Sequence, residues 1–202
     1  TGGGTGIGLA IVRELLDAGW SVVSMALAPV PIADPRLESV VVDLGDSDAT
    51  RAAALDACAR HPVAAVIHNA GAMRPALLAD VTVADLDALV ALHLSAALVI
   101  VQAALPGMRR HRFGRIVLVS SRAALGLATR TAYSTTKAGL FGMALHAASE
   151  GPAASGQLLR RQACTGAISL TQAISASRRK AFASSACLRC TAGLSVTLSS
   201  AS

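Results

Sequence analysis

The sequence predicts an α/β fold built on a doubly wound parallel sheet. Short apolar runs typical of fully buried strands alternate with segments of helical periodicity, as expected when helices cover both faces of a sheet. Polar residues that could bind a ligand or take part in catalysis follow several of these runs. Ligands of such sheets bind beyond the carboxyl ends of the strands. A chain of 202 residues, 53% hydrophobic and 15% charged, can bury the core of one domain.

The first third of the chain predicts a helix and two strands. Residues 6–18 have helical periodicity that ends at Gly19, and residues 21–27 form an apolar run typical of a strand. Three prolines then mark a loop (Pro29, Pro31 and Pro35). The run 40–42 predicts a second strand, which ends at Asp43.

The middle of the chain continues the alternation. Ser47 or Asp48 is placed to cap a helix that runs to Arg60, and residues 63–68 predict a strand. Thr82 and Asp85 have the spacing of a capping box, so a long helix should follow.

That long helix is expected to run to Leu105 and to stop at Pro106-Gly107. Its apolar stretch 86–105 is interrupted by polar residues, so we expect a buried helix and no membrane association. Residues 115–120 then predict a strand, and residues 132–148 predict a helix.

The chain opens with the glycine-rich run Thr-Gly-Gly-Gly-Thr-Gly-Ile-Gly. Glycines let a backbone approach a pyrophosphate closely, and the N-terminus of the following helix offers unpaired N–H groups. Alone, such a turn is weak evidence, but the spacing of Gly2, Gly6 and Gly8 narrows the choice to a dinucleotide site.

A second motif lies near the end of the predicted series of strands and helices. Tyr133 and Lys137 are four residues apart, which places a phenol and an ammonium on one helical face, and Ser121 precedes them at a strand end. A cation beside a phenol stabilises the phenolate, which makes the phenol usable as a proton donor near neutral pH.

Together with Asn69-Ala70-Gly71, these motifs resemble those of the short-chain dehydrogenase/reductase family over residues 1–148. The resemblance implies a Rossmann-like NAD(P)-binding domain. It implies that Gly2, Gly6, Ile7 and Gly8 form the phosphate turn. Asp43 would accept a hydrogen bond from the adenine amino group, or would instead cap a turn.

The resemblance also implies roles near the nicotinamide. Asn69, Ala70 and Gly71 would lie near the ribose, and the preceding His68 is expected to be structural. Lys137 would bind the nicotinamide ribose and assist Tyr133, which would exchange the proton with the substrate oxygen. Ser121, rather than its neighbour Ser120, would hold the substrate carbonyl.

His93 departs from the family pattern, which has an asparagine at this point of the long helix. Imidazole both donates and accepts, so His93 could hold a water and pass a proton in catalysis. It could equally be a core histidine whose hydrogen bonds are satisfied by the protein.

Cofactor choice is weakly specified. NAD-preferring relatives carry an acid at the end of the second strand, where this chain has Ala26-Leu27. Without that acid nothing repels a 2′-phosphate, which favours NADP over NAD. No metal site is expected, since Cys187 and Cys190 have metal-like spacing but no second pair.

The family pattern breaks at both ends. The strand that normally precedes the glycine turn is missing, and the C-terminal strands are expected to be missing too. All 12 acids lie within residues 1–150 beside 12 of the 18 Lys and Arg, so the whole +6 charge belongs to residues 151–202. We interpret residues 149–202 as an aberrant basic tail from a frameshift near residues 144–150, with an arm for nucleic acid or lipid as the alternative.

The sequence thus predicts an NAD(P)-dependent oxidoreductase that interconverts a carbonyl and a secondary alcohol by hydride transfer. The alternative is a non-catalytic NAD(P)-binding or interaction module. We expect a small-molecule carbonyl or alcohol substrate, no nucleic-acid partner, a cytoplasmic location, and a homodimer or homotetramer for the parent protein. The 202-residue chain itself should fold poorly and have little activity.

Overall fold

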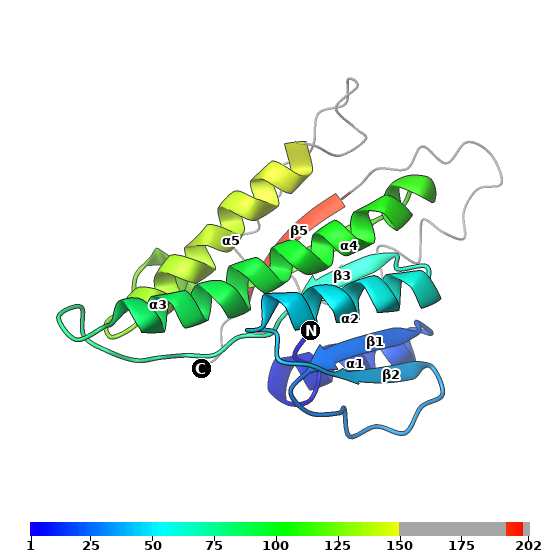
Figure 1. Ribbon diagram of the computed structural model, residues 1–202, viewed down its shortest axis with the longest axis horizontal. Helices are drawn as coiled ribbons and strands as arrows, with labels where there is room; N and C mark the ends of the chain where they lie inside the picture. The colour runs from blue at the N-terminus through cyan, green and yellow to red at the C-terminus, as the bar shows by residue number, and fades with distance from the viewer. Residues whose placement is uncertain (150–192, 200–202) are drawn as a thin grey trace.

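A computed structural model describes residues 1–149 and 193–199 (Figure 1). Helices and strands alternate along the chain from α1 to α5, except that β2 follows β1 directly, and a last strand, β5, follows α5 in the described residues. The predictions that fall on residues 150–192 and 200–202, including those for Cys187, Cys190 and the basic residues of the tail, lie outside the described residues.

The strands pair in parallel, as predicted. β1 (Val22–Ala26) pairs with β2 (Leu37–Val41), and β3 (Ala65–His68) pairs with β4 (Arg115–Ser121). β4 pairs on its other side with β5 (Gly193–Ser199). Because the pairs are parallel, the carboxyl ends of β1 and β2 lie at one edge of their unit, and those of β3, β4 and β5 lie at one edge of theirs.

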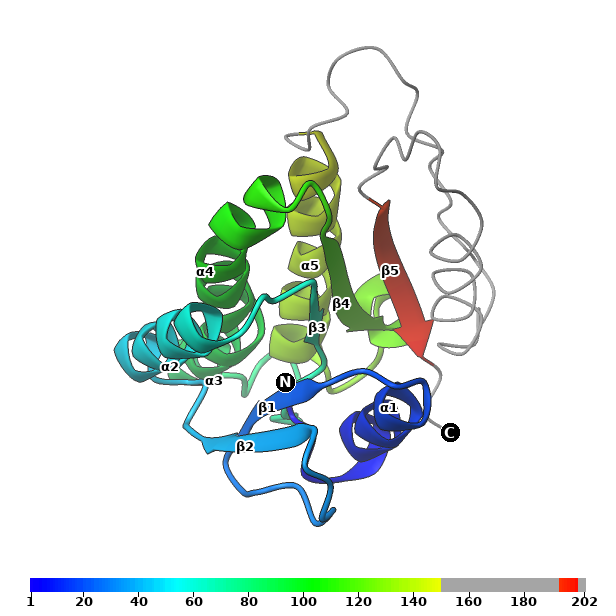
Figure 2. The same ribbon diagram turned by 90° about the vertical axis from the view of Figure 1, so that its right-hand side faces the viewer.

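Helices cover both faces of these strands, which confirms the doubly wound arrangement. Figure 2 shows α1 (Gly6–Asp17) on one face, and α2 (Ser47–Arg60), α4 (Ala96–Arg110) and α5 (Thr131–Ser149) on the other. The main core lies under α2 and α4. Its members are apolar side chains of these two helices, of β1 and β3, and of the segments that follow β2 and β3 (Met25, Leu44, Ala54, Val66, Ala70, Ala96, Ile100, Val101, Ala104 and Met108).

The long helix is divided by a π-helical turn. α3 (Val83–Val90) begins at the predicted capping box of Thr82 and Asp85, and it passes through the π-helix Ala91–Ser95 into α4. Val83–Arg110 is long and apolar enough to cross a membrane by composition alone. In this fold it forms one layer of the domain, packed against α2 and the strands.

Two predicted helix boundaries are wrong. α2 is capped by Asp46, whose carboxylate accepts from the N–H groups of Asp48 and Ala49, and neither Ser47 nor Asp48 is the cap. α4 continues through Pro106 to Arg110. A proline so near the C-terminal end removes only one backbone hydrogen bond, so packing of the helix outweighs its cost.

The sheet is interrupted between β1 and β3. Within the described residues the strands form a two-stranded unit, β1–β2, and a three-stranded unit, β3–β4–β5. A cavity of about 530 Å³ lies between the units, lined by residues of β1, β3, α1 and α4. This is the central position at which the sequence predicts that a strand is missing.

One strand occurs where the sequence predicts none. β5 pairs with β4 over residues 193–199, so the expectation that all C-terminal strands are missing is wrong. Leu194, Val196 and Leu198 alternate with smaller or polar residues, which is a strand pattern of period two that the composition of the tail obscured.

Candidate active site

The glycine turn is fixed between the carboxyl ends of β1 and β3. The N–H of Gly2 donates to the carbonyl of Met25 in β1 over 2.9 Å, and the Thr1 amino group donates to the carbonyl of Ile67 in β3 over 2.7 Å. The turn therefore lies at the edge where ligands of parallel sheets bind.

Three positions in this turn favour or require glycine, and one of them, Gly6, has φ of +52°. Gly2 has φ of +68°, in the left-handed region, and a Cβ there would lie 2.9 Å from the Cα of Ala70. A Cβ on Gly8 would lie 1.8 Å from the carbonyl oxygen of Gly2, which no real structure allows. The first turn of α1 thus packs directly on the loop, as a tight phosphate turn demands.

The N-terminus of α1 has no side-chain cap. Thr5 occupies the N-cap position without a capping hydrogen bond, and the first turn contains no acid. By contrast, α2 and α3 are capped by Asp46 and by the Thr82/Asp85 box. An uncapped helix start with a positive dipole end suits an anion, so these residues fit the pyrophosphate of a dinucleotide.

Asn69, Ala70 and Gly71 follow β3 and pack on the glycine turn. The Thr1 hydroxyl oxygen accepts from the N–H groups of Asn69 and Ala70 over 3.1 and 3.0 Å. His68, fully buried, contacts the same hydroxyl through Nδ1, and burial lowers its pKa to about 3. His68 is therefore neutral and supports the turn, in agreement with its predicted structural role.

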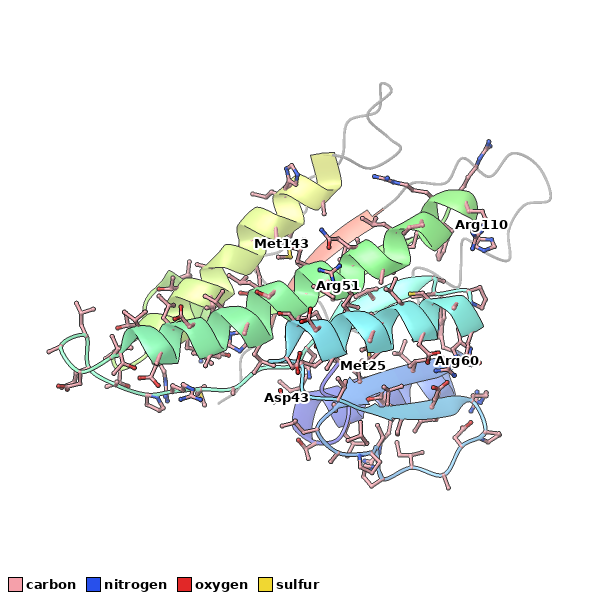
Figure 3. All side chains as sticks on the ribbon, in the orientation of Figure 1. Met25, Asp43, Arg51, Arg60, Arg110 and Met143 are labelled. Atoms are coloured by element: carbon pink, nitrogen blue, oxygen red, sulfur yellow. The ribbon has the colours of Figure 1, made fainter. Side chains whose placement is uncertain are left out.

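Asp43 lies where β2 ends and α2 begins, at the opposite end of α2 from Arg60 (Figure 3). Its Oδ1 accepts from the N–H of Gly45 over 2.8 Å, so the side chain closes a turn. Of the two interpretations left open by the sequence, this contact favours the turn cap, while the exposed position leaves an adenine contact as a proposal.

Lys137 is buried beside Tyr133. Its side chain is 3% exposed, and its Nζ donates to the carbonyl of Val119 in β4 over 2.9 Å. The Nζ lies 5.8 Å from the centroid of the Tyr133 ring. Burial lowers the pKa of Lys137 to about 8. The predicted pair therefore faces inward, and two ammonium protons remain beyond the bond to Val119.

Gly71 brings the turn and this pair together. A Cβ built on Gly71 would lie 3.4 Å from the Nζ of Lys137 and 3.0 Å from the Nε2 of His93. The loop that follows β3 thus reaches the helix that carries Tyr133 and Lys137, and the predicted cofactor and catalytic residues are neighbours.

The two serines at the end of β4 have different environments. The Ser120 hydroxyl is buried and donates to the Lys137 carbonyl over 2.8 Å, which anchors α5 to the strand. Ser121 is half-buried, and its Oγ accepts from the N–H of Ala123 over 3.2 Å. The accessible serine is Ser121, the one that the sequence favours.

His93 is fully buried within the π-helical turn. Its Nε2 accepts from the N–H of Ala72 over 3.1 Å, and its Nδ1 lies 2.8 Å from the Thr136 hydroxyl. Burial and the charge of Lys137 lower its pKa to about 3. Thr1 and Thr136 also organise this region, although no role was predicted for them from the sequence. Only their position beside motif residues pointed to them.

The end of β1 carries no charge. Ala26 is buried and Leu27 is 75% exposed. Arg36 is held by ion pairing to Asp34 at 2.6 Å and by donation to the Leu16 carbonyl over 2.8 Å. Its guanidinium is therefore engaged on the side of α1 away from the turn.

Comparisons with known proteins agree with this geometry. A family model described as short chain dehydrogenase matches residues 1–180. The 3-oxoacyl-[acyl-carrier-protein] reductase MabA of Mycobacterium tuberculosis is 34% identical over 154 residues, which cover 74% of this chain and 61% of that protein. The acetoacetyl-CoA reductase of Synechocystis is 34% identical over 153 residues, which cover 75% of this chain and 63% of that protein.

A solved structure shares the fold. The 3-oxoacyl (acyl-carrier-protein) reductase of Agrobacterium tumefaciens, with NADP bound, has a TM-score of 0.67 and 27% identity, over 74% of this chain and 62% of that chain. The chain belongs to the short-chain dehydrogenase family. It spans about three fifths of the length of the curated relatives it matches.

Proposed function

We propose that the whole protein is an NADP(H)-linked oxidoreductase that interconverts a carbonyl and a secondary alcohol. The observation that carries the proposal is the buried Lys137, beside Tyr133 on one face of α5 and next to Gly71 of the loop that packs on the glycine turn. A buried ammonium is costly unless it serves a partner, and perturbed groups of this kind cluster at functional sites.

Each side chain then has a role in reduction. The nicotinamide, when bound, supplies a hydride to the carbonyl carbon. Tyr133 gives its phenolic proton to the carbonyl oxygen, and Lys137 stabilises the phenolate that remains. Ser121, at the end of β4, donates a hydrogen bond that holds the carbonyl oxygen in place.

The remaining residues of the site would bind the cofactor. The uncapped start of α1, with Gly2, Gly6, Ile7 and Gly8, would receive the pyrophosphate. Asn69, Ala70 and Gly71 would lie along the ribose, and Asp43 would reach the adenine.

We further propose NADP as the preferred cofactor. The uncharged end of β1 offers no carboxylate against a 2′-phosphate, and the similar Agrobacterium protein was solved with NADP. The names of the relatives make a 3-oxoacyl thioester the first substrate class to test.

The test measures NADPH oxidation with acetoacetyl-CoA and a panel of ketones, beside NADPH fluorescence titration. We expect turnover that Tyr133→Phe lowers by roughly 10²-fold or more, because a positioned general acid contributes about 10²–10⁴. Cofactor affinity should change little in this variant. NADPH binding without turnover in the whole protein would contradict the enzyme and favour the non-catalytic binding module.

We propose also that the whole protein assembles as a homodimer or homotetramer through its long helices. Exposed apolar side chains on this layer, such as Leu98 and Leu145, are consistent with a covered surface. Light scattering of the purified whole protein would test this, and a monomer at micromolar concentration would contradict it.

A further inference from the structure

We propose that His93 is a positioning residue that remains neutral, as its Nδ1–H tautomer, and connects the loop after β3 to the helix that carries Tyr133 and Lys137. The contacts of His93 with Ala72 and Thr136 define this role. The kinetic consequences of the role rest on the function proposed above. The alternative that His93 relays protons requires the ring to change protonation state.

The tautomer follows from one hydrogen bond. A backbone N–H can only donate, so the Ala72 N–H, 3.1 Å from the Nε2 of His93, requires a lone pair on that nitrogen. In a neutral ring the proton then resides on Nδ1. A proton added to Nε2 would meet the Ala72 N–H head-on and break the bond.

The second ring nitrogen continues this series of hydrogen bonds in the same donor-to-acceptor direction. Nδ1–H donates to the Oγ1 of Thr136 over 2.8 Å. The Thr136 hydroxyl can then donate its own proton to the carbonyl of Ala132 at 3.1 Å or of Tyr133 at 3.0 Å. Every donor in the series has an acceptor, and only the neutral Nδ1–H tautomer allows this.

The surroundings oppose a charge on the ring. His93 is fully buried, and the titratable groups that face it are Lys137, the edge-on Tyr133 ring at 5.6 Å between centroids, and the buried His68. None of these is a carboxylate. A protonated imidazole would be desolvated beside an ammonium with no carboxylate to balance it.

The π-helical turn provides the geometry. His93 is the central residue of Ala91–Ser95, where the helix widens between α3 and α4. Such insertions are frequent at functional sites. Here the turn directs the ring between Ala72 and Thr136, so that three elements are held together: the loop after β3, the long helix and the second turn of α5.

Glutamine offers a decisive substitution. Its amide carries one acceptor and one donor, spaced much like the two imidazole nitrogens, but it cannot take up a proton near neutral pH. If His93 positions, His93→Gln should keep turnover within about threefold, whereas His93→Leu should lower it by roughly tenfold or more, about 1.4 kcal/mol. If His93 relays protons, both variants should lose turnover equally, and that result would overturn the proposal.

Thr136 should act together with His93. Thr136→Val should lower turnover as much as His93→Leu does. The variant that combines both substitutions should be no slower than either single variant. Thr136→Ser, which keeps the hydroxyl, should restore the rate. Thr135→Val is the matched control, because its exposed hydroxyl bonds only to the Thr131 carbonyl one turn away and should not matter. Additive losses would show that the two residues do not act in one chain.

A measurement without turnover separates this proposal from the enzymatic one. In ¹⁵N-histidine NMR of the whole protein, the His93 signals, assigned by their loss in His93→Gln, should show protonated Nδ1 and unprotonated Nε2 from pH 5 to 8. A titrating ring or the opposite tautomer would overturn the positioning role. A whole protein with the expected tautomer and no reductase activity would contradict the proposed function alone.

Discussion

Lys137 shows how a single buried cation organises this site. Its ammonium is held by the Val119 carbonyl from β4 and lies next to the Tyr133 ring and Gly71. The backbone carbonyl of the same residue accepts from Ser120. Both ends of the residue therefore bind β4, which fixes α5 relative to the strand edge and keeps the ammonium in a dry position where its charge acts strongly.

The lowered pKa of Lys137 predicts a pH limit for reduction. The ammonium is charged below its pKa of about 8 and neutral above it, so its stabilisation of the phenolate is present at low pH and is lost as the pH rises through about 8. We expect kcat/KM for NADPH-dependent reduction to decline above that value, measured from pH 6 to 10.

Two variants check the assignment of this limit. Lys137→Met should lower kcat/KM and remove the decline near pH 8. Ser121→Ala should lower the rate but keep the decline, because it removes a hydrogen bond to the substrate and not a charge. The same midpoint in Lys137→Met would assign the limit to another group.

Leu27 predicts how cofactor preference can be changed. Its side chain is exposed directly after β1, where NAD-preferring relatives carry an acid. We expect Leu27→Asp to weaken NADPH binding at least about tenfold, or ~1.4 kcal/mol, by repulsion of the 2′-phosphate. Leu27→Asn, of nearly the same shape, should leave it within about threefold. Equal Kd values from fluorescence titration of the two variants would show that the 2′-phosphate lies elsewhere.

Single residues were predicted best where a motif fixes the backbone. Gly2, Gly8 and the Tyr133/Lys137 pair are recognisable because a close approach or a helical spacing restricts which residue types can occupy those positions. The support of the site could not be predicted, since Thr1 and Thr136 act through partners 69 and 43 residues away in the chain. Sequence spacing carries no information on such contacts.

At the scale of elements, the helix starts differ according to what they face. α2 and α3 have side-chain caps, whereas α1 has none. Side-chain capping satisfies N–H groups that would otherwise need water or a ligand. The absence of a side-chain cap on α1 is therefore consistent with the anion-binding role proposed for its N-terminus.

The cap of α2 can be tested by a matched pair of substitutions. Asp46→Ala removes an acceptor for two N–H groups and should lower the free energy of unfolding by about 1 kcal/mol. Ser47→Ala, one residue later, should change it by less than about 0.5 kcal/mol. Chemical denaturation of both variants measures the difference, and a larger loss in Ser47→Ala would restore the cap that the sequence favoured.

Elements were predictable where periodicity was long and clear. The helices and the four strands up to Ser121 follow from apolar patterns. The π-helical turn, the passage of α4 through Pro106 and the strand β5 did not. In each case tertiary packing outweighs the local sequence signal. The proline in α4 costs one backbone hydrogen bond, and the π-helical turn positions His93. The strand β5 forms because β4 offers a free edge for pairing.

At the scale of the whole molecule, the sheet is interrupted between its two-stranded and three-stranded units. β1 and β3 each lack a neighbour across the cavity of about 530 Å³, within the described residues. The Thr1 amino group is buried at one end of that cavity, bonded to the Ile67 carbonyl, and burial lowers its pKa to about 6 from 8.0. The folded chain thus contains both unfilled apolar space and a desolvated charge.

In the 202-residue polypeptide taken by itself, whose α-amino group is that of Thr1, the buried amino group makes stability depend on pH. Its pKa is lower in the folded chain than in the unfolded one, so unfolding takes up a proton between pH 6 and 8. The free energy of unfolding should therefore rise with pH over this window, by about 3 kcal/mol in total. The full stability is present above pH 8 and is lost as the pH falls through about 6.

Extending the chain before Thr1 tests two points together: whether the space between β1 and β3 accepts a strand, and whether the Thr1 amino group causes the pH dependence. A segment as long as β1, five residues, rich in valine, should enter the cavity as a parallel strand between β1 and β3 and replace the buried ammonium by an amide. Relieving about 3 kcal/mol at roughly 2–4 °C per kcal/mol predicts a Tm gain of roughly 6–12 °C at pH 6.

A Gly-Ser segment of the same length should also remove the pH dependence but should not fill the cavity. At pH 8.5, where the charge no longer matters, only the valine-rich extension should raise Tm. Equal Tm values for the two extensions at that pH would mean that the space between β1 and β3 does not accept a strand.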